Sequence, residues 1–268
     1  MTNSGKVYLV GAGPGDPELL TIKAVRLLGK ADVVLVDDLV NRAILVYARE
    51  DARVIPVGKR GGCKSTPQTF IERLMIAEAK AGRMIVRLKG GDPGIFGRSG
   101  EETEALSRAG IECEIVNGIT SGLAAATSAG VPLTHRNAAH GVIFVTAHAS
   151  AEDGPDWAAL VSTRMTLVVY MGVARCAAVQ QALLDAGLAP ATPAVVVENA
   201  SLARERQVRT RLDRLAHDMR EHDIGSPAIM LIGEVAGANV QSWIPACAGM
   251  TMQARRVPAS PGMRATDD

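Results

Sequence analysis

The sequence predicts an α/β fold of two domains, the first built on a parallel sheet and the second on a mixed sheet. Short apolar runs alternate with segments of helix length up to about residue 116, a pattern typical of βαβ units. The pattern then changes, and Arg204–Arg211 alternates in the way expected of an antiparallel strand. A chain of 268 residues, 47% of them hydrophobic, is long enough for one large or two small domains.

In the first domain, each predicted strand is a short apolar run bounded by glycine, proline or polar residues. The five strands, which we expect to form one parallel sheet, are Val7–Val10, Val33–Val36, Arg53–Val57, Met84–Leu88 and Glu112–Val116. Between them, Pro17–Leu28 is predicted to be a helix with Asp16 as its N-cap, because proline is favoured in the first turn. Two further helices are predicted, at Pro67–Ala81 after the N-cap Thr66 and at Gly100–Ala109.

The second domain is predicted to begin with Thr120–Ala129, a helix of small residues suited to close backbone packing. Four more strands are expected at Val142–Thr146, Leu167–Tyr170, Ala194–Val197 and Ile229–Ile232, with helices at Ala174–Ala186 and Leu212–Glu221. We therefore divide the chain into a first domain of residues 1–117 and a second of 118–244. Residues 245–268, which hold three prolines and show no periodicity, are expected to form a disordered tail.

Composition excludes several classes of protein. The net charge of +1 argues against a nucleic-acid binder, and 27 glycines against only eight aromatic residues argue against base-stacking or aromatic-cage sites. No apolar run approaches the ~18 residues of a membrane span. The four cysteines form no CxxC pair and the N-terminus does not resemble a secretory leader, so we expect reduced thiols and a cytoplasmic location.

The strongest local feature is a glycine loop at Gly11–Asp16, between a predicted strand and a predicted helix. Such a turn brings backbone N–H groups close to a ligand. A dinucleotide fingerprint is the competing interpretation, and Asp37 lies about where that fingerprint needs an acid. The third glycine of GxGxxG is replaced by Asp16, however, and Pro14 removes a donor where a pyrophosphate needs one, so a dinucleotide oxidoreductase is the less favoured hypothesis.

A second glycine loop, Gly90–Gly97, follows the fourth predicted strand. Because the carboxyl ends of parallel strands meet at one edge of a sheet, the two loops are expected to define a ligand crevice. Cations lie on loops at the same edge, and together they would suit a polyanionic small molecule: Lys59, Arg60, Lys89, Arg98 and Arg136.

Other site chemistries lack their motifs. His217 and His222 are five residues apart, not four, and no other histidine has a ligand at motif spacing, so no metal site is predicted. The sequence contains neither the GxSxG of a nucleophile elbow nor the GxxxxGK[ST] of a P-loop.

Six motifs in order resemble the tetrapyrrole methylase family. They are GAGPGD (Gly11–Asp16), VGKR (Val57–Arg60), VRLKGGDPGIFGRSGEE (Val86–Glu102), PLTHR (Pro132–Arg136), VVYMG (Val168–Gly172) and VEN (Val197–Asn199). The resemblance implies a homodimeric, two-domain enzyme that binds S-adenosyl-L-methionine in the cleft between its domains and releases S-adenosyl-L-homocysteine. Its best-matching branch implies two methyl transfers that turn uroporphyrinogen III into precorrin-2 through precorrin-1, toward siroheme, cobalamin or haem d1.

The resemblance also assigns residues. It implies that the cofactor contacts Pro14, Gly90, Gly91, Asp92, Ile95, Thr120, Ser121, Met171 and Ala200. It implies that Asp37 is a proton acceptor and Lys59 a proton donor, and that Arg98, Glu101 and Arg136 face the tetrapyrrole. A carboxylate such as Asp37 could take the proton that leaves the methylated ring system.

Four positions depart from the family pattern. Val36 and Asp38 stand where relatives carry Tyr and Arg, which affects expected substrate contacts, and Ser121 and Ala200 stand where relatives carry Ala and Gly. Another methylase of the same fold is the main alternative, including relatives that act on a modified histidine or on ribosomal RNA. The chain offers no space for the dehydrogenase and ferrochelatase domain of some relatives, so we expect neither of those activities.

Overall fold

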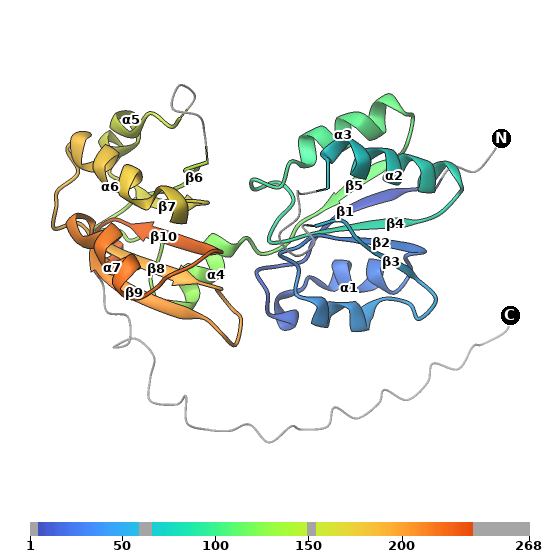
Figure 1. The fold of residues 1–268 in the computed structure, drawn as a ribbon, viewed down its shortest axis with the longest axis horizontal. Coiled ribbons are helices and arrows are strands. Elements are labelled where there is room, and N and C mark those ends of the chain that lie inside the picture. The colour runs from blue at the N-terminus through green and yellow to red at the C-terminus, as the bar shows by residue number, and fades with distance from the viewer. Residues whose placement is uncertain (1–4, 59–65, 149–153, 238–268) are drawn as a thin grey trace, which may run out of the picture.

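The computed structural model describes residues 5–58, 66–148 and 154–237. Two α/β domains lie side by side in Figure 1, the first in blue to green and the second in green to orange. This arrangement confirms the predicted fold class, since one five-stranded sheet is parallel and the other is mixed. The predicted tail, 245–268, lies outside the described residues.

The first sheet has the strand order β3-β2-β4-β1-β5, and all its neighbouring strands are parallel. Its strands are β1 (Val7–Gly11), β2 (Val33–Val36), β3 (Arg53–Pro56), β4 (Ile85–Lys89) and β5 (Cys113–Val116). The five predicted strands are therefore confirmed, with ends that differ by one residue at most. Because β4 lies between β2 and β1, the carboxyl ends of these three strands are neighbours, and this places the glycine loops together.

Helices cover both faces of the first sheet. Figure 1 shows α2 (Gln68–Lys80) and α3 (Ser99–Arg108) on one face and α1 (Ile22–Leu28) on the other. Strand residues alternate between the two cores, so Ile85 packs under α2 and α3 whereas Val86 packs toward α1.

The prediction of a single helix at Pro17–Leu28 is wrong, because the segment forms a 3₁₀ turn followed by a separate α-helix. Asp16 caps only a short 3₁₀ turn, η1 (Pro17–Leu19), by accepting from the Glu18 N–H at 2.9 Å. Thr21 then caps α1 by accepting from the Ala24 N–H at 3.1 Å. The segment holds two good capping residues, and the second begins the α-helix. The predicted N-cap Thr66 is also not observed, since α2 begins after Pro67 without a side-chain cap.

The second sheet has the order β6-β7-β10-β8-β9. Its strands are β6 (Val142–Thr146), β7 (Thr166–Tyr170), β8 (Pro193–Glu198), β9 (Arg206–Arg211) and β10 (Ala228–Ile232). Strands β6 and β7 are parallel and the other pairs are antiparallel, so the antiparallel strand predicted at Arg204–Arg211 is confirmed apart from its first two residues.

Helices again cover both faces. The small-residue helix α4 (Ser121–Ser128) packs on one face of the second sheet, and its alanines lie in the core. On the other face lie α5 (Trp157–Ser162), α6 (Cys176–Asp185) and α7 (Leu215–Glu221), as Figure 1 shows. Short 3₁₀ segments complete the fold: η2 (Arg42–Tyr47), η3 (Val173–Arg175), η4 (Leu212–Arg214) and η5 (Glu234–Gly237). No helix in the described ranges is both long enough and apolar enough to cross a membrane.

The two domains touch at loops from both sheets. The Phe96 ring lies 4.9 Å from the ring of Tyr170 at the end of β7. The Asp16 N–H donates to the Ser201 hydroxyl at 3.1 Å, and Ile95 packs against the core of the second domain. Loops that follow β1, β4, β7 and β8 are thereby held at one place.

Candidate functional site

The two glycine loops of the first domain are hydrogen-bonded to each other. The Gly91 N–H donates to the Gly13 carbonyl at 2.8 Å, and the Gly13 N–H donates back to the Gly91 carbonyl at 3.2 Å. Both residues have positive φ, 70° at Gly13 and 68° at Gly91, which glycine adopts without steric cost. The predicted convergence of the loops is therefore confirmed.

The segment that enters the second domain packs directly on these loops. A Cβ placed on Gly118 would lie 2.3 Å from the Gly91 carbonyl oxygen and 2.8 Å from Gly11 Cα, so only glycine fits. The Asp92 carboxylate fixes this contact by accepting from the Gly118 N–H at 3.0 Å and the Gly94 N–H at 2.7 Å. Asp92 is buried and both its oxygens accept hydrogen bonds, so its carboxylate holds the second glycine loop against the segment that enters the second domain.

Tyr170 anchors the beginning of α4, where the predicted site residues Thr120, the N-cap, and Ser121, the first helical residue, lie. Its hydroxyl lies 2.8 Å from the Thr120 hydroxyl and accepts from the Gly122 N–H at 2.8 Å. Burial is the main cause that raises the pKa of Tyr170 above its usual value. Sequence reasoning placed this residue in a motif without a role, although a tyrosine that ends a buried strand needs a partner for its hydroxyl.

Backbone strain is concentrated in the same loops. Residues other than glycine with positive φ include Phe96 (53°), Met171 (54°), Asn199 (52°) and Ser201 (67°). Such conformations cost about 1–3 kcal/mol each and cluster at ligand sites. All four residues adjoin or coincide with positions predicted to bind the cofactor.

These contacts bring the nine predicted cofactor residues into one region, whose loops follow β1, β4, β7 and β8 and precede α4. Gly91 lies beside Thr120, since its added Cβ would be 3.6 Å from Thr120 Cα. Ser201, next to Ala200, bonds to the loop that holds Pro14, and Met171 directly follows Tyr170.

The chemistry of this region fits S-adenosylmethionine. Ile95 is half-buried and Met171 is 49% exposed, so aliphatic and thioether surface is available for an adenosyl group. Glycine backbone without bulky side chains, together with the beginning of the eight-residue helix α4, lets a ligand approach the main chain closely. The group needs no metal ligand, and its adenine can be held by aliphatic walls and backbone polar groups instead of an aromatic stack.

Asp37 lies at the carboxyl end of β2, beside the glycine loops. Its Oδ2 accepts from Arg87 Nη2 at 3.1 Å, and its side chain is 34% exposed. Lys59, the predicted proton donor, lies outside the described residues. The preceding Gly58 packs on the backbone of Asp38, where an added Cβ would lie 2.5 Å from the Asp38 nitrogen.

The predicted substrate residues are exposed. Arg98 Nε donates to Glu101 Oε1 at 2.8 Å, and Arg98 has φ of 55° at the start of α3. The hydrogen bond from Arg98 is the main cause that lowers the pKa of Glu101. Arg136 is exposed on the loop after α4.

The prediction that Lys89 is a loop cation is wrong. Lys89 is the last residue of β4 and is 3% exposed, and its Nζ donates to Glu102 Oε2 at 2.8 Å. Since successive strand residues alternate in direction, Lys89 points into the layer beneath α3 instead of toward the ligand edge. Arg87 and Glu102, in the same layer, were missed, although charges inside an apolar central strand are an unusual signal.

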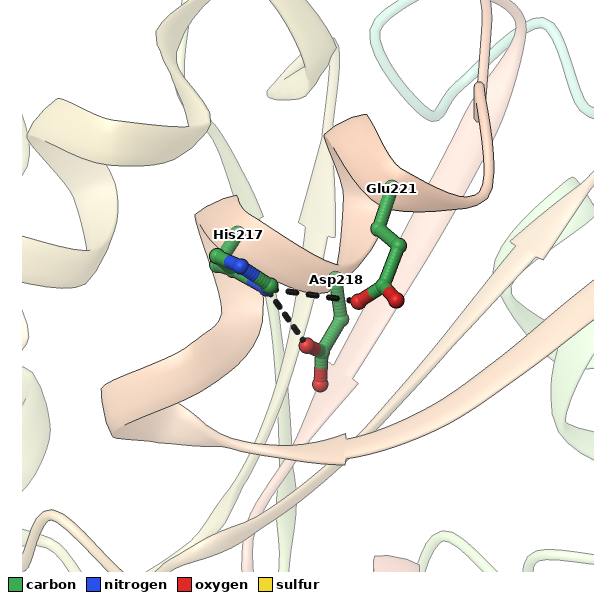
Figure 2. A group of neighbouring side chains, drawn as sticks. All are labelled: His217, Asp218 and Glu221. Carbon is green, nitrogen blue, oxygen red and sulfur yellow. Dashed lines mark hydrogen bonds and ion pairs between the residues drawn. The ribbon is translucent and has the colours of Figure 1, made fainter.

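One surface cluster has the residue types of a metal site. In Figure 2, His217, Asp218 and Glu221 of α7 point toward one another, with His217 Nδ1 3.1 Å from Asp218 Oδ1 and 3.5 Å from Glu221 Oε2. Asp218 also accepts from Arg214 at 2.9 Å, so these contacts form an ion-pair network on the surface. The prediction that the chain holds no metal stays a prediction.

Comparisons with known proteins place the chain among methyltransferases of this architecture. The profile of the family Tetrapyrrole (Corrin/Porphyrin) Methylases matches residues 6–216. A uroporphyrinogen-III C-methyltransferase of Pseudomonas aeruginosa is 59% identical over 232 residues, which cover 87% of this chain and 94% of that protein.

Two solved structures share the fold. The uroporphyrin-III C-methyltransferase of Thermus thermophilus, solved with S-adenosylhomocysteine, is 44% identical with a TM-score of 0.75, covering 86% of this chain and 98% of that one. A cobalt precorrin-4 methyltransferase of cobalamin biosynthesis is 32% identical with a TM-score of 0.78, covering 87% of this chain and 96% of that one.

Proposed function

Because the chain belongs to the tetrapyrrole methylase family, we propose that it transfers methyl groups from S-adenosyl-L-methionine to ring carbons of uroporphyrinogen III. Two transfers give precorrin-2 through precorrin-1. The observation that carries the proposal is the mutual hydrogen bonding of Gly13 and Gly91, packed on Gly118. It gathers loops of both domains around a backbone-rich region whose chemistry suits the methyl donor.

We propose that the nine predicted residues hold the cofactor in two ways. Gly90, Gly91, Thr120, Ser121 and Ala200 bring the main chain close to the cofactor, and Pro14, Ile95 and Met171 present apolar surface. Asp92 contributes indirectly, because its carboxylate accepts from the Gly118 N–H and fixes that backbone. When bound, the cofactor supplies an electrophilic sulfonium methyl group to the electron-rich carbon of the substrate.

The residues of this chain then contribute positioning and proton transfer. Attack on a methyl group needs an in-line geometry, which rigid loops on both sides of the site can impose. The methylated ring system loses a proton, and Asp37 is proposed to accept it because its carboxylate is partly exposed at the strand edge beside the glycine loops. Lys59 is proposed as the proton donor on the basis of the family motif alone.

We propose that the exposed charges of Arg98 and Arg136 serve to bind the substrate, which carries eight carboxylates. Arg98 and Arg136 can form bidentate hydrogen bonds with such groups. Glu101 is proposed to hold the Arg98 guanidinium until the substrate binds, since the two side chains are already paired. A few exposed arginines are enough to attract this substrate although the net charge of the chain is only +1.

The proposal is tested by incubating the protein with uroporphyrinogen III and methyl-labelled S-adenosylmethionine, with NAD as the control ligand. We expect label in the macrocycle and a higher melting temperature with S-adenosylhomocysteine but not with NAD. Stabilisation by NAD without label transfer would favour a dinucleotide oxidoreductase instead.

We also propose that the protein is a homodimer in the cytoplasm. The dimer is implied by the family resemblance, and a reducing compartment is consistent with Cys113 and Cys176, which are free thiols. Burial raises the pKa of each thiol to about 11, so both are poor nucleophiles. Light scattering at several protein concentrations would detect the dimer, and a monomer throughout would refute it.

A further inference from the structure

Arg87 is a charged side chain in the interior of the first domain. It lies in β4, the central strand of the sheet, and is only 2% exposed. It is on the face covered by α2 and α3, where the neighbouring strand residue Ile85 belongs to an apolar core. An arginine in such a place needs partners for its guanidinium, because an unpaired buried charge is very costly.

Each guanidinium nitrogen of Arg87 has a partner. Nε donates to Glu102 Oε1 at 3.3 Å, Nη1 to the Leu88 carbonyl at 3.1 Å, and Nη2 to Asp37 Oδ2 at 3.1 Å. The planar fork therefore joins a buried carboxylate of α3 to the carboxylate that ends β2. Because these bonds come from one rigid group, the position of Glu102 fixes the direction from which Arg87 meets Asp37.

Glu102 is in turn fixed by two other groups. Lys89 Nζ donates to its Oε2 at 2.8 Å, and Gln68 Nε2 donates to its Oε1 at 3.0 Å. Glu102 is fully buried, with 0% of its surface exposed. Burial is the main cause that lowers the pKa of Lys89, and the charge of Glu102 opposes that shift.

Asp37 is held at one oxygen and open at the other. Its Oδ2 takes the Arg87 bond, its side chain is 34% exposed, and no described residue hydrogen-bonds its Oδ1. The network of Arg87, Lys89, Glu102 and the partly exposed Asp37 has two cationic and two anionic side chains, so it can hold a guanidinium against Asp37 without an uncompensated charge. Buried ion pairs are weak evidence for stability, and they need another reason to persist.

We propose that Arg87 is a positioning residue, which aims the free oxygen of Asp37 at the proton that the methylated ring system loses. Glu102 supports this role by setting the orientation of Arg87. The inference rests on the proposed function, in which Asp37 is the proton acceptor. Arg87, a charged group in the sheet interior, thereby contributes to proton transfer and not only to folding.

A double-mutant cycle between Arg87→Met and Asp37→Asn tests the coupling. Arg87→Met is expected to lower kcat at least ~10-fold, within the range of general acid–base effects, with KM and the Kd of S-adenosylhomocysteine changed less than ~2-fold. In the Asp37→Asn background the same change is expected to alter kcat less than ~2-fold, because the group that it positions is gone. Arg87→Lys is expected to recover part of the loss, since it returns the charge without the fork.

Lys89→Met is the matched control, because it removes the other buried cation bonded to Glu102. It leaves the bond between Arg87 and Asp37, and the Gln68 bond still fixes the Glu102 oxygen that faces Arg87. Both methionine variants are expected to unfold at lower urea concentration, and only Arg87→Met is expected to reduce kcat ~10-fold. Equal losses of kcat from Arg87→Met with and without Asp37→Asn would overturn the proposal. If Arg87→Met does not fold, Arg87→Lys in the two backgrounds gives the same comparison.

The outcomes separate this inference from the proposed function. Wild-type kcat in Asp37→Asn would overturn the positioning role while methyl transfer by the wild type still stood. Absence of methyl transfer by the wild type would refute the proposed function. A crystal structure of the Arg87→Met or Arg87→Lys protein needs no substrate and can be compared with the wild type whatever the assay shows. We expect the Asp37 carboxylate to be turned from its wild-type orientation. An unchanged orientation would overturn the positioning role.

Discussion

Removal of the Tyr170 hydroxyl should weaken both the fold and cofactor binding. The side chain is buried, and its hydroxyl makes hydrogen bonds of 2.8 Å with the Thr120 hydroxyl and the Gly122 N–H. In Tyr170→Phe the ring still packs, so the loss comes from the polar groups left behind. A buried donor without a partner costs about 1–3 kcal/mol, and the Thr120 hydroxyl can rotate toward another acceptor, so we expect a loss of about 2 kcal/mol.

The same substitution should affect ligand binding because both bonds fix the first turn of α4. If about half of the 2 kcal/mol appears as weaker ligand binding, because the site is less well ordered, the Kd of S-adenosylhomocysteine rises about 5-fold. Urea unfolding measures the first effect and titration calorimetry measures the second. Tyr47→Phe is the control, since Tyr47 is 39% exposed and has no hydrogen-bond partner for its hydroxyl among the described residues. Indistinguishable unfolding free energies and Kd values for the two variants would show that the Tyr170 hydroxyl does not fix the start of α4.

Further substitutions probe the packing of Gly118, the charge of Asp218 and the exposed arginines. Gly118→Ala should destabilise the protein by at least about 2 kcal/mol in urea unfolding, because the Cβ would meet backbone atoms at 2.3 Å and 2.8 Å, whereas Gly100→Ala, which meets nothing within 4 Å in α3, should stabilise it by up to ~1 kcal/mol. Asp218 has a pKa lowered to about 2, first by its hydrogen bond from Thr210, so its contribution to stability is full above its ordinary value of 3.8 and is lost as pH falls through about 2. Asp218→Asn should therefore be less stable than the wild type at pH 7 and match it near pH 2, and a constant difference in unfolding free energy across that range would contradict this. Arg98→Ala and Arg136→Ala should each raise the KM for uroporphyrinogen III with little change in the Kd of S-adenosylhomocysteine, and equal losses of both affinities would show that the assigned division is wrong.

Local sequence patterns predicted most of the secondary structure. Val33–Val36 and Val142–Thr146 were predicted with both ends correct, because each is an apolar run bounded by polar residues or glycine. The segment at residues 17–28 was misjudged since both Asp16 and Thr21 can cap a helix, and local sequence does not decide between them. Helix α5 was missed because six residues show too little periodicity.

The site was predictable to the extent that strand ends determine it. All strands of the first sheet are parallel, so the loops after Gly11 and Lys89 had to lie on the same edge. What could not be predicted is the order of strands, which puts β2 beside β4 and Asp37 within reach of Arg87. Lys89 points into the interior because it shares a face of β4 with Ile85 and Arg87, and which face α3 covers is set by the tertiary fold.

Two methyl transfers to carbon atoms of uroporphyrinogen III are the activity proposed for this chain. Mass spectrometry of the macrocycle after complete reaction with S-adenosylmethionine counts the transferred methyl groups directly. We expect two methyl groups for each macrocycle, with a singly methylated species that rises and then falls. A macrocycle that gains no methyl group, or one that stops at a single methyl group with cofactor in excess, would contradict it.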